Sequence, residues 1–101
     1  MPRSVPFDEY LTERLKDSKL AEEYLKAALQ DDDPRVFLQA LRNVAQARGI
    51  AKVAAKSKLN RESMYRMLSK SGNPQFSSLA ALLESLGLAL SVKVKEHALA
   101  A

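Results

Sequence analysis

The residues best suited to contact another molecule lie in one stretch, residues 53–68, of this 101-residue chain. Their spacing predicts two short helices joined by a tight turn, as in a helix-turn-helix, whose second helix enters the DNA major groove. Asn60 can begin that second helix because its side chain accepts a hydrogen bond from a free backbone N–H. Met64 and Met67 then face inward at helical spacing. The pattern predicts a nucleic-acid interface.

The outward positions around this turn carry side chains that bind DNA. Arginine pairs with O6 and N7 of guanine, and glutamate accepts a hydrogen bond from N4 of cytosine. Lysine suits phosphates, which position a protein without specifying sequence. For any single lysine, the alternative is a solvated surface charge. The predicted base-reading residues are Arg61, Glu62, Ser63, Tyr65 and Arg66, and the predicted phosphate contacts are Arg48, Lys52, Lys56, Lys58, Asn60 and Lys70.

The turn itself combines two common features with one departure. Ala54 is small enough for two helices to approach closely, and Leu59 is placed to anchor the turn. Lys58 occupies a position where such turns commonly hold glycine. A lysine there must adopt a positive φ at some energetic cost.

Charge is divided unevenly along the chain. Residues 8–33 hold nine acidic and four basic residues, a net charge of −5, whereas residues 34–73 hold nine basic residues and one acidic residue, a net charge of +8. The basic block suits a polyanion, which the acidic block would repel. The acidic block has two open interpretations, a second binding surface or ordinary solvated helix faces.

Composition argues against several classes of function. The chain has no cysteine, which excludes disulfides, thiolate metal sites and a cysteine nucleophile. His97 is its only histidine and has no partner for a metal site. We therefore predict no enzyme activity, metal or cofactor. Residues 1–6 lack the apolar run of a signal peptide, and no apolar stretch approaches the ~20 residues of a membrane span. We expect a soluble cytoplasmic protein with no membrane contact.

The elements that position the predicted interface are helical. We predict an all-α fold of five to six helices in one compact domain, with a flexible N-terminus (1–6), an acidic helical segment (7–33), a helix-turn-helix core (34–87) and a C-terminal strand (88–95). Asp33 and Pro34 predict a helix start, and Gly49 predicts its end. The tail alternates apolar and polar residues, as strands do. A lone strand must pair with the N-terminal segment, a second copy or a partner's sheet.

Several pieces of the chain resemble a known family. Residues 40–45 read Ala-Leu-Arg-Asn-Val-Ala, residues 60–65 read Asn-Arg-Glu-Ser-Met-Tyr, and residues 72–77 read Gly-Asn-Pro-Gln-Phe-Ser. These resemble the probable addiction-module antidote proteins, which are HigA-like antitoxins with an Xre-type, lambda-repressor-like helix-turn-helix. The resemblance covers roughly residues 7–94. The family usually has glycine at position 58 and serine or threonine at position 60.

The resemblance implies an antitoxin of a bacterial type II toxin–antitoxin pair. Such a protein neutralises a small basic HigB-like toxin of the RelE/ParE superfamily and represses its own operon by binding double-stranded operator DNA as a homodimer. The residues expected to contact the toxin are Asp17, Glu22, Glu23 and Tyr24. The alternatives are a free-standing Xre-like transcriptional regulator without a toxin partner, and a protein-interaction module that does not bind DNA.

Overall fold

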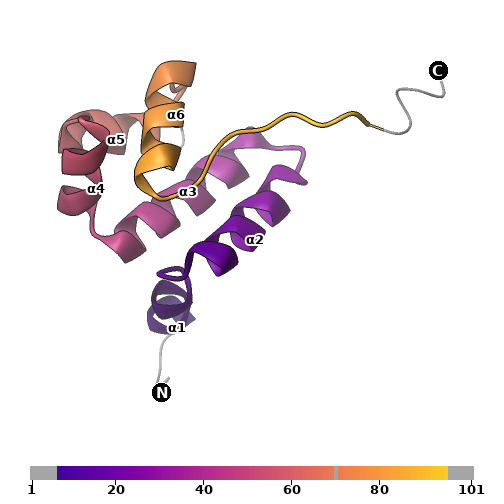
Figure 1. Ribbon diagram of the computed structural model, residues 1–101, viewed down its shortest axis with the longest axis horizontal. Coiled ribbons are helices and arrows are strands. Elements are labelled where there is room, and N and C mark those ends of the chain that lie inside the picture. The colour runs from indigo at the N-terminus through magenta and orange to yellow at the C-terminus, as the bar shows by residue number, and fades with distance from the viewer. Residues whose placement is uncertain (1–6, 70, 96–101) are drawn as a thin grey trace.

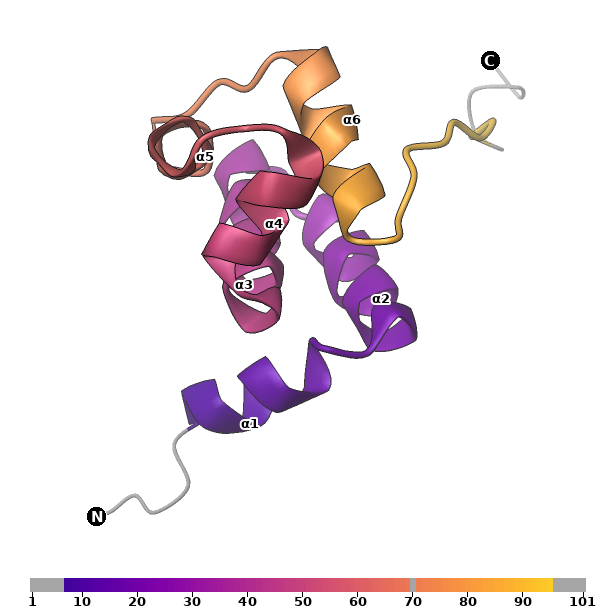
Figure 2. The ribbon, with the colours of Figure 1, turned by 60° about the vertical axis from the view of Figure 1, so that its left-hand side comes forward.

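Six α-helices account for the regular structure in a computed structural model that describes residues 7–69 and 71–95. Figures 1 and 2 show them as a bundle from which the C-terminal tail extends. This confirms the all-α fold and the predicted number of helices. None of the described helices is long and apolar enough to cross a membrane. The helices are α1 (Phe7–Arg14), α2 (Ser18–Leu29), α3 (Pro34–Arg48), α4 (Ile50–Ser57), α5 (Arg61–Met67) and α6 (Phe76–Ser85).

Side-chain caps begin three of these helices, as local sequence predicts for two of them. The Asp33 carboxylate accepts a hydrogen bond from the backbone N–H of Arg35, and Pro34 opens α3. Asn60 caps α5 in the same way, and Asp17 caps α2. Gly49 ends α3 at a φ of 97°, a backbone conformation that glycine adopts without strain.

Helix α3 organises the core. It packs against α1, α2 and α4, while α4 also contacts α5 and α6. In Figure 1, α3 runs diagonally between α2 and the side of the bundle that holds α4, α5 and α6. The α4–α5 pair is therefore fixed to the rest of the molecule through buried apolar side chains. The largest fully buried side chains are Leu15, Leu41, Val44, Met64, Leu82 and Leu86.

Helix α5 ends at Met67, and nearby hydrogen bonds show why it stops there. The Ser69 hydroxyl donates a hydrogen bond to the Arg66 carbonyl (2.8 Å), and the Ser69 backbone N–H donates to the same oxygen (3.3 Å). A serine that bonds to a nearby backbone group in this way competes with continued helix. The chain then folds back, so that a Cβ at Gly72 would collide with the backbone of Met67.

The predicted C-terminal strand is wrong as a formed element. Residues 88–95 lie outside any helix or strand of the described chain. The last backbone hydrogen bond among the described residues runs from the Leu88 N–H to the Leu83 carbonyl (2.9 Å). A strand is stable only beside another strand, and the described residues place none next to this segment.

Candidate nucleic-acid interface

The connection between α4 and α5 has the geometry that the sequence predicts. Three residues separate the helices, and Lys58 adopts a left-handed conformation with a φ of 63°. The Leu59 backbone N–H donates to the Ala54 carbonyl (3.1 Å), which satisfies an acceptor at the end of α4. Ala54 is buried, and Leu59 packs against the core. This tight junction confirms the positive φ expected at Lys58 and is compatible with a helix-turn-helix.

The two faces of α5 differ sharply. Met64 and Met67 are buried beneath the helix and hold it to the core. The Asn60 side-chain oxygen accepts a hydrogen bond from the Ser63 backbone N–H (2.6 Å), which fixes the start of the helix. Ser63 is half-buried, whereas four of the predicted base-reading residues are exposed. These four are Arg61, Glu62, Tyr65 and Arg66.

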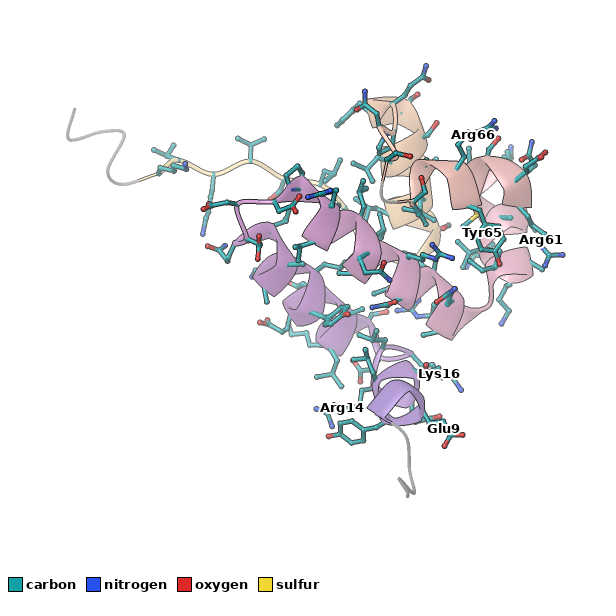
Figure 3. The ribbon with its side chains drawn as sticks, turned by 180° about the vertical axis from the view of Figure 1, so that it is seen from behind. Glu9, Arg14, Lys16, Arg61, Tyr65 and Arg66 are labelled. Atoms are coloured by element: carbon teal, nitrogen blue, oxygen red, sulfur yellow. The ribbon has the colours of Figure 1, made fainter. Side chains whose placement is uncertain are left out.

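The exposed residues spread across the outer face rather than along one line. At about 100° per residue, Glu62 lies farthest from the buried methionines, with Tyr65 and Arg66 on either side of it. Figure 3 shows Arg61, Tyr65 and Arg66 projecting from α5, far from the labelled α1 residues. An Arg66 guanidinium nitrogen lies 3.5 Å from the Ser63 hydroxyl, at the long limit of a hydrogen bond. The helix therefore presents two cations around one carboxylate.

Arg42 joins this surface, although sequence reasoning missed it. Its guanidinium carbon lies 5.7 Å from the centre of the Tyr65 ring, within the range of a cation–π contact. The contact links α3 to α5 and adds a positive charge at the edge of the exposed face of α5. Helical spacing places Arg42 at the margin of the buried face of α3, but it does not show which helix lies opposite.

The predicted phosphate-binding residues are divided by the fold. Lys52, Lys56 and Lys58 are exposed on α4 and the turn. Asn60 is exposed and uses its side-chain oxygen as the α5 cap. Lys70 lies outside the described residues. Three basic side chains thus surround the α4–α5 junction.

Arg48 has a different environment from the lysines. Its guanidinium donates hydrogen bonds to the backbone carbonyls of Leu15 (3.3 Å) and Leu86 (3.2 Å) and to the Ser18 hydroxyl (3.3 Å). Leu15 directly follows α1, Ser18 is the first residue of α2, and Leu86 directly follows α6. Arg48 is half-buried and ties three parts of the chain together. Its guanidinium therefore suits a structural role better than a phosphate contact.

The residues expected to contact a protein partner also separate by environment. The Asp17 carboxylate accepts from the backbone N–H groups of Lys19 and Leu20, at 2.8 and 3.2 Å. Glu22 is half-buried and lies 3.7 Å from Lys26, while Glu23 is exposed. Among the residues expected to contact a protein partner, only Glu22 and Glu23 have a carboxylate that does not cap a helix.

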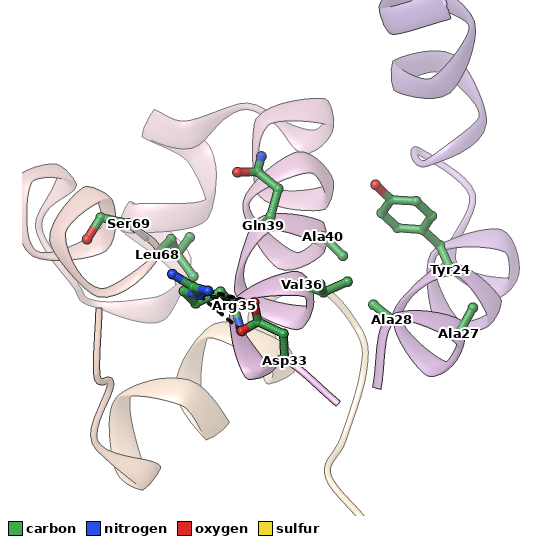
Figure 4. A pocket seen from close by; sticks show the side chains of 10 residues that line it. All are labelled: Tyr24, Ala27, Ala28, Asp33, Arg35, Val36, Gln39, Ala40, Leu68 and Ser69. Carbon is green, nitrogen blue, oxygen red and sulfur yellow. Dashed lines mark hydrogen bonds and ion pairs between the residues drawn. The ribbon is translucent and has the colours of Figure 1, made fainter. Parts of the chain in front are cut away.

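Tyr24 borders a hollow that crosses α3. Its hydroxyl accepts a hydrogen bond from the Asn43 side-chain amide (2.8 Å), which ties α2 to α3. The hollow has a volume of about 660 Å³, and Figure 4 shows Tyr24 on one side of α3 and Leu68 on the other. The lining is largely apolar, with a single ion pair at its centre.

That ion pair joins Asp33 to Arg35. The Arg35 guanidinium donates to both Asp33 carboxylate oxygens at 2.9 to 3.1 Å. Hydrogen bonding by Arg35 lowers the pKa of the Asp33 carboxyl and raises the pKa of the Arg35 guanidinium. The same carboxylate caps α3, so the pair stabilises a helix start as well as lining the hollow.

The fold and this surface define a small all-helical protein with a basic helix pair compatible with helix-turn-helix recognition. The chain matches the sequence profile of a family described as "probable addiction module antidote protein" over residues 5–94. A protein of Haemophilus influenzae, described as an uncharacterized protein, is 33% identical over 97 residues, covering 87% of this chain and 100% of its own length. No solved structure matches the chain. The chain belongs to the family of probable addiction module antidote proteins.

Family membership confirms the resemblance found in the sequence. It assigns the chain an antidote role in an addiction module, which implies a toxin as partner.

Proposed function

We propose that this antidote protein binds double-stranded operator DNA through α5 and represses its own operon. The observation that carries this proposal is the contrast between the two faces of α5. The inner face is fixed by Met64 and Met67, and the outer face exposes Arg61 and Arg66 after a three-residue turn. A rigidly held helix with arginines outward suits the major groove, whose base edges arginine binds with two hydrogen bonds.

The residues around the turn divide naturally between bases and phosphates. Arg61 and Arg66 would pair with guanine, and Glu62 between them would accept from cytosine. Lys52, Lys56 and Lys58 would contact phosphates on either side and fix the orientation of the helix. Each such contact makes affinity more sensitive to salt, because it releases a counterion from the DNA.

Arg42 and Tyr65 form the edge of the proposed interface. The Arg42 guanidinium carbon lies 5.7 Å from the centre of the Tyr65 ring, so the ring lies beside α3 at the edge of α5. From there the tyrosine hydroxyl suits a sugar or phosphate contact better than a base edge, and the arginine adds charge beside it.

A homodimer would match two such helices to an inverted repeat. The recognition helices of helix-turn-helix dimers lie about one DNA turn apart, ~34 Å along the duplex. One copy makes too few base contacts to distinguish its operator strongly from other DNA, because each good pairing contributes only about 1–3 kcal/mol. Two copies bound to one operator would double the free energy that separates the correct DNA sequence from a wrong one.

We further propose that the toxin is a small basic protein of the RelE/ParE superfamily, held by the acidic face of α2. Glu22, which lies 3.7 Å from Lys26, and Glu23 carry the carboxylates of that face that do not cap a helix. A Glu22→Lys/Glu23→Lys variant should lose the cognate toxin in a co-purification assay. A matched variant, Asp32→Lys/Glu84→Lys, makes the same charge change at exposed sites elsewhere and should retain it. Equal retention by both variants would refute the α2 surface.

The DNA proposal is tested by binding to the DNA upstream of the gene and to a scrambled duplex at two salt concentrations. Arg61→Ala/Arg66→Ala should weaken operator binding by about 10²-fold or more, since each bidentate contact is worth about 1–3 kcal/mol. Lys19→Ala/Lys26→Ala removes the same charge from exposed sites on α2 and should bind as the parent does. Equal loss in both variants would mean that net charge, not α5, causes binding.

A further inference from the structure

The tail after α6 has one apolar and one polar face in extended conformation. Leu88, Leu90, Val92 and Val94 alternate with Ala89, Ser91, Lys93 and Lys95, and alternate residues of an extended chain point to opposite sides. Val92 is 98% exposed and Val94 67% exposed. Together with Leu90, which is 41% exposed, they form a row of exposed apolar side chains, and contiguous apolar surface often indicates an interaction site.

The start of the tail is attached to the helices. Leu88 is half-buried, packs against the core and donates its backbone N–H to the Leu83 carbonyl. Leu88 belongs to the apolar set, so the apolar face of the tail begins at the core and continues outward. Figures 1 and 2 both show the following residues extending away from the helices. Among the described residues, no backbone hydrogen bond involves residues 89–95.

We propose that residues 88–95 pair in antiparallel fashion with the same residues of a second copy. The inference deepens the proposed dimer by naming its contact surface, and it rests on the proposed function only for the role of that dimer. A two-stranded ribbon would provide the tail's peptide groups with partners along one edge. It would also give each exposed valine an apolar neighbour across the strand pair.

The residue order of the tail fits this self-pairing. If two tails cross at Val92, Leu90 lies opposite Val94 of the second copy, and the two Val92 side chains face each other. On the other side of the ribbon, Lys93 lies opposite Ser91 and Lys95 lies opposite Ala89. If the tails cross at Ser91, Leu90 faces Val92 and Lys93 faces Ala89. In both registers apolar residues meet apolar residues, and no lysine faces a lysine.

Charge disfavours the competing arrangements. Parallel tails in register would place Lys93 beside Lys93 and Lys95 beside Lys95, and like charges directly opposite each other are destabilising. The edge strand of a basic partner would meet the same two lysines. Because antiparallel self-pairing avoids both conflicts, a second copy of this chain is the occupant that the tail fits best.

The oligomeric state of the full chain tests the proposal. Sedimentation equilibrium of the parent should show a monomer–dimer equilibrium. Val92→Glu should raise the dimer dissociation constant by about tenfold or more, because it places a charge in the apolar face of both tails. Ala89→Glu is the matched control, since in either register its carboxylate faces a lysine. It should dimerise at least as well as the parent. A monomeric parent, or equal dimers in all three proteins, overturns the proposal.

Single cysteines then test the register. The chain contains no cysteine, so any disulfide must come from the introduced residue. Val92→Cys or Ser91→Cys should form a disulfide dimer under mild oxidation, since facing residues lie within disulfide reach. Ala55→Cys, exposed on α4, should remain monomeric on the same timescale. Cross-linking at neither tail position refutes the pairing.

The outcomes also separate this inference from the proposed function. Tail-dependent dimers that ignore operator sequence would support the pairing and refute DNA recognition. Specific operator binding by a protein whose dimer is unaffected by Val92→Glu would refute the pairing alone. A monomeric parent that loses only its toxin on Val92→Glu would assign the tail to the toxin's sheet and overturn the second-copy assignment.

Discussion

Replacing Arg48 with methionine distinguishes its two possible roles. Sequence patterning places Arg48 among the phosphate contacts, whereas the folded chain uses its guanidinium to bond Leu15, Leu86 and Ser18. Methionine keeps an unbranched apolar stem of moderate length and removes every donor. If the guanidinium is a structural tie, Arg48→Met should lower the stability of the free protein. If the guanidinium is a phosphate contact, the stability of the free protein should be unchanged and its affinity for DNA should fall.

The geometry sets the expected magnitude of the stability loss. A hydrogen bond to a charged group contributes about 1.5–3 kcal/mol. The three bonds of Arg48 are 3.2–3.3 Å long, beyond the ~2.7–2.9 Å of the strongest charge-assisted bonds, and the side chain is half-exposed. We therefore count the two carbonyl bonds at the low end and expect a loss of about 2–3 kcal/mol. That is a large part of the ~5–15 kcal/mol that stabilises a typical domain.

Urea denaturation followed by circular dichroism measures this loss. With a slope of roughly 1–3 kcal/mol per molar urea, a loss of about 2–3 kcal/mol should lower the midpoint by about 0.7–3 M. Lys52→Met is the control, because Lys52 is exposed on α4. The free energy of unfolding of this variant should differ from that of the parent by no more than about 0.5 kcal/mol. An unchanged midpoint for Arg48→Met, together with weaker DNA binding and a shallower salt dependence, would refute the structural assignment.

Three further changes have defined outcomes. Lys58→Gly should raise the free energy of unfolding by about 0.5–1 kcal/mol, because glycine adopts the left-handed conformation without the strain of a lysine. The same change removes one proposed phosphate contact and should reduce the salt slope of DNA binding by about 1. Equal or lower stability in urea denaturation would show that Lys58 is not strained. Asn60→Ala should lower stability by about 1 kcal/mol through loss of the α5 cap, whereas an unchanged urea midpoint would show that the cap is dispensable. Because Arg35 lowers the pKa of Asp33 in the folded chain, its contribution is complete above about pH 4 and is lost as pH falls through the lower folded pKa. Acid unfolding of Asp33→Asn should therefore depend less on pH in that range than acid unfolding of the parent, and identical pH profiles would exclude the pair as a cause.

The sequence predicts local features of this fold better than long-range contacts. The cap at Asp33, the cap at Asn60 and the helix end at Gly49 are confirmed, because each depends on the chemistry of one residue and its immediate neighbours. The left-handed Lys58 follows from the same local reasoning. Burial of Met64 follows from helical spacing.

The tertiary contacts could not be predicted in this way. Arg48 bonds to carbonyls 33 and 38 positions away, and no periodic pattern records which chain segments will meet it. Arg42 likewise belongs to the candidate interface only because the fold brings its guanidinium within cation–π distance of the Tyr65 ring. The tail failed as a predicted strand for a related reason. Its alternation of apolar and polar residues suits pairing with another strand, but residues 7–69 and 71–95 of one chain supply no such strand.

The shortness of α5 links recognition to the integrity of the whole molecule. The helix has seven residues, whereas isolated helices below ~12–15 residues are marginal in water. Its order depends on the Asn60 cap and on Met64 and Met67 in the core. The order of the surface proposed to contact DNA therefore depends on the folding of the rest of the molecule. If the chain represses its operon as proposed, a protease or chaperone that captures the unfolded chain would lower operator occupancy in proportion to the fraction of the protein that it removes.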